Sequence, residues 1–119
     1  MTTISNLMRA LPDASAAEVL DTLLQAPGIR IERIVSQGQA TPPDFWYDQP
    51  WSEWVLLVSG SAGIQLEGEE REHHLLPGDH LLIPPRRRHR VTRTDADRQT
   101  VWLAVHFGAV GEADNDSIH

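Results

Sequence analysis

The stretch Pro77–His89, PGDHLLIPPRRRH, leads through a turn, a short apolar strand and a double proline to a histidine. Pro77 presets the bend of the turn, and Gly78 permits the positive φ that such a turn needs. The imidazole of His89 can bind a metal ion or carry a proton, although a histidine that points into a core is often only a hydrogen-bonded core residue. The rigid approach to His89 makes it the first candidate for chemistry.

The arginines around His89 concentrate positive charge. All ten basic residues of the chain are arginine, and six of them lie between Pro85 and Gln99. Arginines at a strand end can form a charged rim that protects an edge from aggregation. Alternatively, one of Arg86, Arg88 or Arg90 clamps an anionic substrate, because a planar guanidinium fits a carboxylate or a phosphate.

The elements that must position these side chains are short strands. From Ile29 onward, segments rich in β-branched or aromatic residues alternate with joints that contain Gly, Pro, Asp or Asn. This spacing predicts an all-β sandwich or barrel. The predicted strands are IRIERIV, EWVLLV, AGIQLEG, EHHLL, HLLIP, HRVTRT and TVWLAVHF.

The N-terminal part has a different pattern. In DASAAEVLDTLLQAPG, Ser15 and Glu18 have the spacing of a capping box, and Pro27 with Gly28 would end a helix. The apolar stripe at helical spacing consists of Val19, Leu20, Leu23 and Leu24. We therefore expect residues 1–28 to form a short helical segment that packs on the barrel.

One motif resembles a known family. The pattern Gly78-x5-Pro84-x4-His89 resembles the second motif of the cupins, which are small jelly-roll barrels with a double-stranded β-helix fold. In that family the histidine at this position is a metal ligand. The motif departs from the family pattern at two places, because the family usually has a glycine where this chain has Arg86 and an asparagine where it has Arg93.

The first cupin motif is present only in part. Glu53-x6-Gly60 resembles its second half, and the glutamate is a metal ligand in the family. The usual histidine pair falls on Tyr47 and Gln49, or with longer spacing on Trp46 and Asp48. The run FWYDQPWSEWVLLVSGSA resembles a bacterial cupin subgroup that carries FWYDQ in place of the histidine pair. The resemblance covers residues 29–107, and we expect residues 108–119 to be a flexible tail.

A replacement ligand is available on the last predicted strand. In TVWLAVHF, Trp102, Ala104 and His106 share one face, so an inward orientation would bring His106 towards Glu53 and His89. Two histidines and one carboxylate are the ligand set of non-haem iron oxygenases. Oxygen ligands could also come from Asp48 or Gln49, and a phenol from Tyr47.

The resemblance implies a small cupin that binds a small molecule, with a divalent metal ion (Zn, Fe, Mn or Ni) held by His89 and Glu53. In an enzyme of this kind Glu53 could serve as general base, and Tyr47 and Arg88 are the candidates for contact with an anionic substrate. The alternative is a metal-free, non-catalytic module for ligand or protein binding, in which Glu53 pairs with an arginine or with His89. Whether the chain is an enzyme stays open at this point.

Composition argues against several classes of partner and of chemical site. The net charge is −7, with 17 acidic and 10 basic residues, which argues against nucleic acid or an anionic membrane as partner. The absence of cysteine excludes disulfides, thiolate ligands and a cysteine nucleophile. No signal-peptide pattern and no apolar stretch near the ~20 residues of a membrane span is found, so we expect a soluble, cytoplasmic protein.

The resemblance also implies a homodimer. Alternation places Trp54 on the opposite face from Glu53. Trp54 is therefore expected between sheets or at a subunit interface rather than in the ligand pocket.

Overall fold

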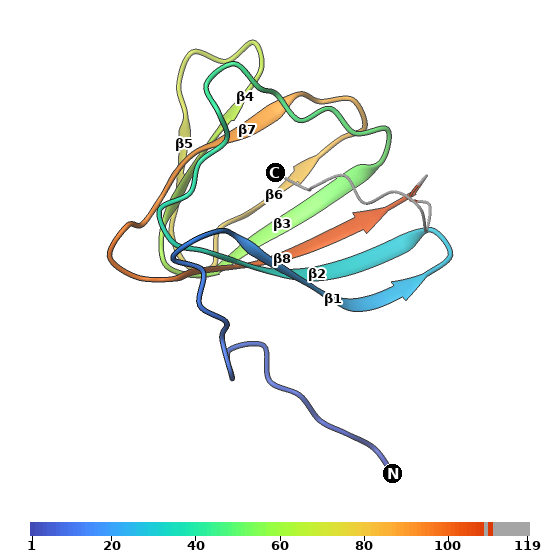
Figure 1. The fold of residues 1–119 in the computed structure, drawn as a ribbon. Coiled ribbons are helices and arrows are strands. Elements are labelled where there is room, and N and C mark those ends of the chain that lie inside the picture. Colours follow the sequence, from blue (N-terminus) through green and yellow to red (C-terminus); the bar gives the residue numbers. More distant parts are fainter. Residues whose placement is uncertain (109, 111–119) are drawn as a thin grey trace.

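The computed structural model describes residues 1–108 and 110, and the elements in this part of the chain are all strands (Figure 1). In chain order they are β1 (Val19–Ala26), β2 (Ile29–Ser36), β3 (Ser52–Ser59), β4 (Ala62–Leu66), β5 (His73–Leu75), β6 (His80–Ile83), β7 (His89–Thr94) and β8 (Thr100–Phe107). The predicted all-β architecture is confirmed, and every strand predicted from Ile29 onward is present. No helix that could cross a membrane occurs among the described residues.

The strands form two antiparallel sheets that lie on opposite sides of one core (Figure 1). The larger sheet has the order β1-β2-β8-β3-β6, and the smaller has the order β5-β4-β7. Side chains that alternate along each strand point inward from both sheets and bury the core. The largest apolar core residues include Ile34, Leu57, Ile64 and Trp102.

The predicted N-terminal helix is wrong. Residues 19–26 form β1, which pairs with β2 from Val19↔Val35 to Ala26↔Ile29. Glu18 does not close a capping box, because its carboxylate accepts a hydrogen bond from Ser36 Oγ at 2.8 Å. The leucine spacing that resembles a helix is accommodated by a β-bulge between Thr22 and Leu24.

A two-residue turn explains why residues 19–26 form a strand and not a helix. Pro27 and Gly28 connect β1 to β2, and Gly28 has a φ of +78°. The turn that was expected to end a helix therefore closes a hairpin. A short helix is marginal without tertiary contacts, whereas β1 gains a ladder of hydrogen bonds along β2 that only the bulge at Leu23 interrupts. The predicted C-terminal tail lies outside the described residues, apart from Gly108 and Val110.

The PGD turn forms as predicted. Asp79 N donates to Leu76 O at 2.9 Å, and Gly78 has a φ of +96°. The Asp79 carboxylate accepts a hydrogen bond from Leu76 N at 2.8 Å, and the turn is tied to β3 by Gly78 N, which donates to Leu57 O. These bonds fix the start of β6, the strand that leads to the double proline and His89.

Candidate functional site

Three polar residues lie side by side on the inner face of the larger sheet. The register pairs Arg30 on β2 with His106 on β8, and His106 with Glu53 on β3. Directly opposed residues of an antiparallel pair point to the same side of the sheet. All three are buried, and Glu53 and His106 have no exposed surface. The predicted inward orientation of His106 is therefore present in the structure.

Glu53 meets His89 from the opposite sheet. Nε2 of His89 lies 3.5 Å from Oε1 of Glu53. Nδ1 of His89 lies 2.9 Å from the carbonyl oxygen of Arg87, which can only accept, so Nδ1 carries a proton. A backbone carbonyl on Nδ1 is the arrangement that orients a histidine whose Nε2 binds a metal ion.

The carboxylate of Glu53 is fully buried but lacks hydrogen-bond donors in the part of the chain that the structure describes. Neither of its oxygens accepts a hydrogen bond from any described residue. A buried carboxylate without donors is destabilised by several kcal/mol, unless a cation or a proton neutralises it. The centre formed by Glu53 and His89 is thus suited to a positively charged guest.

The FWYDQ segment brings Tyr47 to His89 and buries the Gln49 side chain. Tyr47 N donates to His89 O at 2.8 Å, and His89 N donates to Tyr47 O at 3.1 Å. This bridge places the two rings 5.9 Å apart between centroids. Gln49 follows two residues later, and its side chain is buried. The backbone carbonyl oxygen of Gln49 accepts a hydrogen bond from Arg86 N at 2.6 Å. Tyr47 and Gln49 are one of the two pairs onto which the spacing places the histidines of the cupin pattern, and Tyr47 is the member that contacts His89.

His106 is held by two partners that the sequence did not reveal. Trp51 Nε1 donates to His106 Nδ1 at 2.8 Å, and His106 Nε2 lies 3.0 Å from Glu32 Oε1. An indole N–H can only donate, so Nδ1 is the acceptor and Nε2 carries the proton that faces Glu32. Both ring nitrogens are engaged, and a metal ion could bind His106 only by displacing Trp51 or Glu32.

Arg30 and Glu32 are interior charges that sequence reasoning missed. Arg30 Nε lies 3.6 Å from Glu32 Oε2, and the Arg30 guanidinium carbon is 5.7 Å from the centre of the Trp51 ring. The available signal was the alternation in IRIERIV, which puts Arg30, Glu32 and Ile34 on one face. Because Ile34 is a core residue, the two charges on its face had to point inward.

The structure does not bring Asp48 or Arg88 to this centre. Asp48 is exposed and its Oδ1 lies 3.3 Å from Arg86 Nη1, whereas Arg88 Nη1 lies 2.7 Å from Glu67 Oε2 at the surface. Arg87 pairs in the same way with Glu69 at 3.0 Å. These pairs fit the interpretation of the arginine run as a charged rim.

Arg86 occupies the position where the cupin motif usually has glycine, and its φ is +64°. This left-handed conformation is the reason that glycine suits the position. In this chain an arginine adopts it, and its backbone N–H and its guanidinium contact Gln49 and Asp48 respectively. The departure from the motif therefore leaves the turn intact and ties it to the FWYDQ segment.

A second group of titratable residues lies on the outside. A cavity of about 510 Å³ between β5 and β6 is lined by Glu69, His73, His74, Asp79 and His80 together with leucines. His73 Nε2 lies 2.6 Å from Glu69 Oε1, and this hydrogen bond is the main cause that lowers the pKa of the Glu69 carboxyl. His74 pairs with Glu72 at 3.2 Å, the Asp79 carboxylate accepts a hydrogen bond from Leu76 N, and the His80 ring packs against Trp54. These acids and histidines are thus engaged with separate partners and do not converge on a second centre.

A metal ion fits the Glu53–His89 centre in part. No group of three or more His, Cys, Asp or Glu side chains in the described part of the chain could hold a metal ion. Two ligands that each bind one ion at about 2.1 Å lie about 3 to 3.5 Å apart, which matches the separation of His89 Nε2 and Glu53 Oε1. A third protein ligand would have to be an amide or phenol oxygen, and Gln49 is the buried residue of that kind on the adjoining segment.

The comparisons with known proteins identify the family. The family model described as "Cupin domain" matches residues 32–106. The chain belongs to the cupin family. This confirms the double-stranded β-helix expected from the two motifs, whereas the FWYDQ subgroup stays a prediction. No curated protein matches the chain.

Solved cupin structures are similar over most of the chain. A protein from Ralstonia eutropha JMP134, provisionally named a mannose-6-phosphate isomerase, is 49% identical with a TM-score of 0.87, and the match covers 91% of this chain and 100% of that one. A cupin superfamily protein from Desulfitobacterium hafniense DCB-2 is 19% identical with a TM-score of 0.64, covering 84% and 91% respectively. An RmlC-like cupin from Methanocaldococcus jannaschii is 15% identical with a TM-score of 0.66, covering 90% and 91%. The last two similarities concern the fold alone.

Proposed function

We propose that this cupin binds a small molecule at a divalent metal ion held by Glu53 and His89, with Gln49 as the third protein ligand. The observation that carries the proposal is the Glu53 carboxylate, which is fully buried and accepts no hydrogen bond from the described residues. The fixed Nδ1 proton of His89 leaves its Nε2 directed at that carboxylate. Zinc, iron, manganese and nickel all accept this mixture of nitrogen and oxygen ligands.

The charges of the named interior residues support the same proposal. Arg30 balances Glu32, and His106 is neutral because its Nδ1 accepts a hydrogen bond from Trp51. His89 would be neutral when its Nε2 binds a metal ion, so the charge of Glu53 would then be left for the ion to balance. A divalent ion would change the local sum from −1 to +1. A carboxylate or phosphate group would then complete the charge balance, which points to an anionic ligand.

Tyr47 is the residue that we assign to ligand contact. It lines a cavity of about 170 Å³ together with Glu18, Gln39, Ala40, Thr41, Pro42 and Val91, and its ring packs beside His89. His89 and Glu53 do not line this cavity, so the assignment of Tyr47 depends on the position of its ring beside His89. Arg88 is left out of this assignment because its guanidinium pairs with Glu67 at the surface.

An enzymatic role is supported by the named relative. The Ralstonia eutropha protein carries the name of an isomerase of a sugar phosphate, which is an anionic substrate. A bound divalent ion would supply Lewis-acid polarisation of a substrate oxygen. The residues of this chain would orient the ligand through Tyr47 and keep bulk water from the buried Glu53. We therefore propose a metal-dependent enzyme that acts on a small phosphorylated or carboxylated molecule.

A metal-free binding module is the second candidate. It is favoured by the finding that the described residues contain no set of three His, Cys, Asp or Glu side chains suited to a metal ion. In that case Glu53 and His89 would form a buried acid–base pair, and Glu53 would accept a hydrogen bond from the ligand.

Elemental analysis of untagged protein separates the two candidates. We expect about one zinc, iron, manganese or nickel ion per chain, lost in Glu53→Gln and in His89→Ala. The matched control is His73→Ala, which removes a histidine that also contacts a glutamate but lies at the surface, and it should keep the metal. Protein that stays metal-free after incubation with each ion would support the metal-free module instead.

A further inference from the structure

The cavity between β5 and β6 lies where an edge of one sheet faces an edge of the other. In the described part of the chain, the larger sheet ends at β1 and β6, and the smaller sheet ends at β5 and β7. The cavity, which we call the β5–β6 groove, has a volume of about 510 Å³ and is lined by residues of both strands together with Leu66, Glu69, Gly78 and Asp79. A volume of this size is within the range of ligand sites.

The backbone of β6 directs hydrogen-bonding groups towards this groove. Leu57 N donates to Asp79 O at 2.9 Å, so the carbonyl group of Asp79 faces β3. Alternate residues of a strand share this direction, so Leu81 continues the bonding to β3. The N–H and C=O groups of His80 and Leu82 therefore point to the opposite side, which is the edge of the sheet. Neither residue forms a backbone hydrogen bond to another segment of the described chain on that side.

The other edges of the two sheets are protected. β7 is covered by the segment before β3, because Thr41 N donates to Val91 O and Tyr47 forms a bridge with His89. β1 contains a bulge and the charged residue Asp21, and β5 is only three residues long. In contrast, β6 has the sequence HLLI, without an acidic residue, an arginine, a proline or a bulge. An edge strand of this kind is a template for the addition of another strand.

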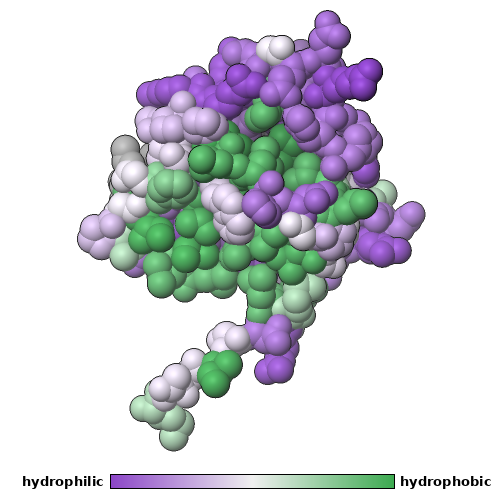
Figure 2. Space-filling view, turned by 180° about the vertical axis from the view of Figure 1, so that it is seen from behind, coloured by the Kyte–Doolittle hydropathy of each residue, from purple (hydrophilic) through white to green (hydrophobic). Residues whose placement is uncertain are grey.

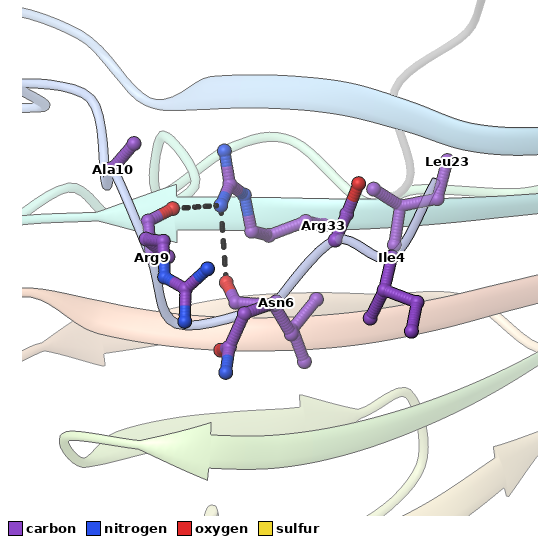
Figure 3. Close-up of a pocket in the computed structure, with 8 residues that line it drawn as sticks. Ile4, Asn6, Arg9, Ala10, Leu23 and Arg33 are labelled. Carbon is purple, nitrogen blue, oxygen red and sulfur yellow. Dashed lines mark hydrogen bonds between the residues drawn. The ribbon is translucent and has the colours of Figure 1, made fainter. Parts of the chain in front are cut away.

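Two other surface features lack such an edge. A cavity of about 670 Å³ near β1 and β2 is lined mainly by the N-terminal segment of the chain itself. This segment is held by Arg33, whose Nη1 donates to the carbonyl oxygens of Leu7 and Arg9 (Figure 3). One face of the molecule is hydrophobic over a broad area (Figure 2), so exposed apolar side chains alone do not identify a docking site. The β5–β6 groove combines apolar side chains with backbone groups that can pair.

The side chains of the groove indicate the composition of the strand that would fit. The groove is lined by two carboxylates, from Glu69 and Asp79, and by no arginine. Its apolar lining consists of Leu66, Leu75, Leu81 and Leu82. Successive side chains of an added strand point to opposite sides, so alternating apolar and basic residues would meet the leucines and the carboxylates respectively. The attraction is moderate, because Glu69 already pairs with Arg87 at 3.0 Å.

We propose that the β5–β6 groove binds an extended basic peptide segment of another protein, which adds to β6 as a further strand of the larger sheet. The backbone groups of His80 and Leu82 pair with the peptide, and the carboxylates of Glu69 and Asp79 attract its basic side chains. Because β6 has four residues between the PGD turn and the double proline, the paired stretch is about that long. The groove is separate from the Glu53–His89 centre, so this binding does not depend on a metal ion.

Fluorescence anisotropy of a labelled synthetic hexapeptide of alternating valine and lysine tests the proposal. Two matched probes carry glutamate in place of lysine or a proline at the centre, and we expect neither to bind. NaCl at about 0.5 M should weaken binding of the lysine peptide. Glu69→Gln should raise its Kd severalfold, whereas Glu67→Gln, which removes a carboxylate paired with Arg88 outside the groove, should not. Equal binding of all three peptides, or no binding of the lysine peptide, would overturn the proposal.

A pair of variants at Leu82 tests the backbone pairing. Leu82→Pro removes the N–H that points to the edge and leaves the bonds to β3 in place, which an edge strand tolerates. Leu82→Ala removes the same side chain but keeps the N–H. We expect Leu82→Ala to retain most of the affinity and Leu82→Pro to lose about tenfold or more. A Leu82→Pro variant that binds the peptide as well as Leu82→Ala does would contradict strand addition.

Amide hydrogen exchange in the wild-type protein gives a second readout that needs no variant. Bound peptide should slow the exchange of the His80 and Leu82 amides, as measured by NMR spectroscopy. Unchanged exchange at both amides while the peptide is bound would overturn the proposal, even if Leu82→Pro does not fold. Sedimentation velocity without peptide identifies the other occupant: a wild-type oligomer that Leu82→Pro dissociates and Leu82→Ala does not would assign the groove to a second copy of the chain.

Discussion

At the scale of single residues, the tautomer of a buried histidine separates a metal ligand from a structural group. His89 has its Nδ1 proton fixed by a carbonyl and directs Nε2 at Glu53. His106, which alternation also places in the interior, has both nitrogens occupied by Trp51 and Glu32. His89 therefore directs Nε2 at the Glu53 carboxylate, whereas both ring nitrogens of His106 face other partners.

The Trp51–His106 hydrogen bond predicts a difference between two buried tryptophans. Trp51→Phe removes the donor to His106 Nδ1 and leaves a buried acceptor unsatisfied, which costs about 1–3 kcal/mol beyond the lost packing. Trp102→Phe removes a longer bond of 3.3 Å to Ser36 Oγ, and that hydroxyl still donates to Glu18. Urea unfolding should show Trp51→Phe to be the less stable variant by about 1 kcal/mol or more. Equal loss of stability would mean that this hydrogen bond contributes nothing specific.

At the scale of secondary structure elements, the two motif glycines belong to turns with different surroundings. Gly60 has a φ of +90°, and a Cβ at this position would lie 2.7 Å from the Cα of Thr100, with Thr100 Oγ1 closer still. Gly78 has a φ of +96°, but a Cβ there would meet no atom within 4 Å. The left-handed backbone penalises alanine at both positions, and the overlap adds to it only at Gly60.

These two positions therefore predict unequal effects. Gly78→Ala should lower the free energy of unfolding by about 1–2 kcal/mol, the penalty of the left-handed conformation. Gly60→Ala should lower it by about 3 kcal/mol or more, because Thr100 begins β8 and its backbone cannot move without disturbing the pairing with β2. Chemical denaturation of the two variants tests the order. A Gly60→Ala variant as stable as Gly78→Ala would show that the start of β8 adjusts readily.

Local pattern was sufficient for most of the fold. The strands from Ile29 onward follow from their alternation and from turn residues such as Gly78, which act within a few positions of the chain. Residues 19–26 were misassigned because their leucine spacing satisfies a helix, and only the pairing with β2 and the bulge at Thr22 select a strand. Tertiary pairing overrode local propensity at that point.

Only the site residues that belong to a recognised sequence motif could be predicted from the sequence. Glu53 and His89 were found from the cupin spacings, and the structure places them in contact. The partners of His106 lie 55 and 74 residues away in the sequence, at Trp51 and Glu32. No local pattern encodes such distant hydrogen bonds, so the sequence alone left His106 open as a ligand. Arg30 was not predicted to be an interior residue, because a charged side chain in a strand usually faces solvent.

At the scale of the whole molecule, the net charge of −7 opposes the expected association of two copies through the outer face of the larger sheet. The register aligns the apolar residues Leu24, Ile31, Val105, Trp54 and Leu82 across that face. Two copies that approach face to face bring together two acidic bodies, and their repulsion opposes association. A contact through this face would not need ion pairs between copies, because Asp21 and Arg33 are already paired within each chain. Salt should therefore screen the repulsion without weakening the contact.

The balance between charge repulsion and apolar contact predicts the direction in which salt changes the Kd of the dimer. Raising NaCl from about 0.02 M to about 0.5 M shortens the Debye length from roughly 20 Å to roughly 4 Å, so the repulsion between the two chains should largely disappear. We expect the dimer to tighten, which sedimentation equilibrium at the two salt concentrations would record as a lower Kd. An interface made of charged pairs would respond in the opposite direction, because salt screens attraction as well as repulsion. A Kd that rises with salt would thus show that the contact contains ion pairs between copies and does not consist of the apolar face alone.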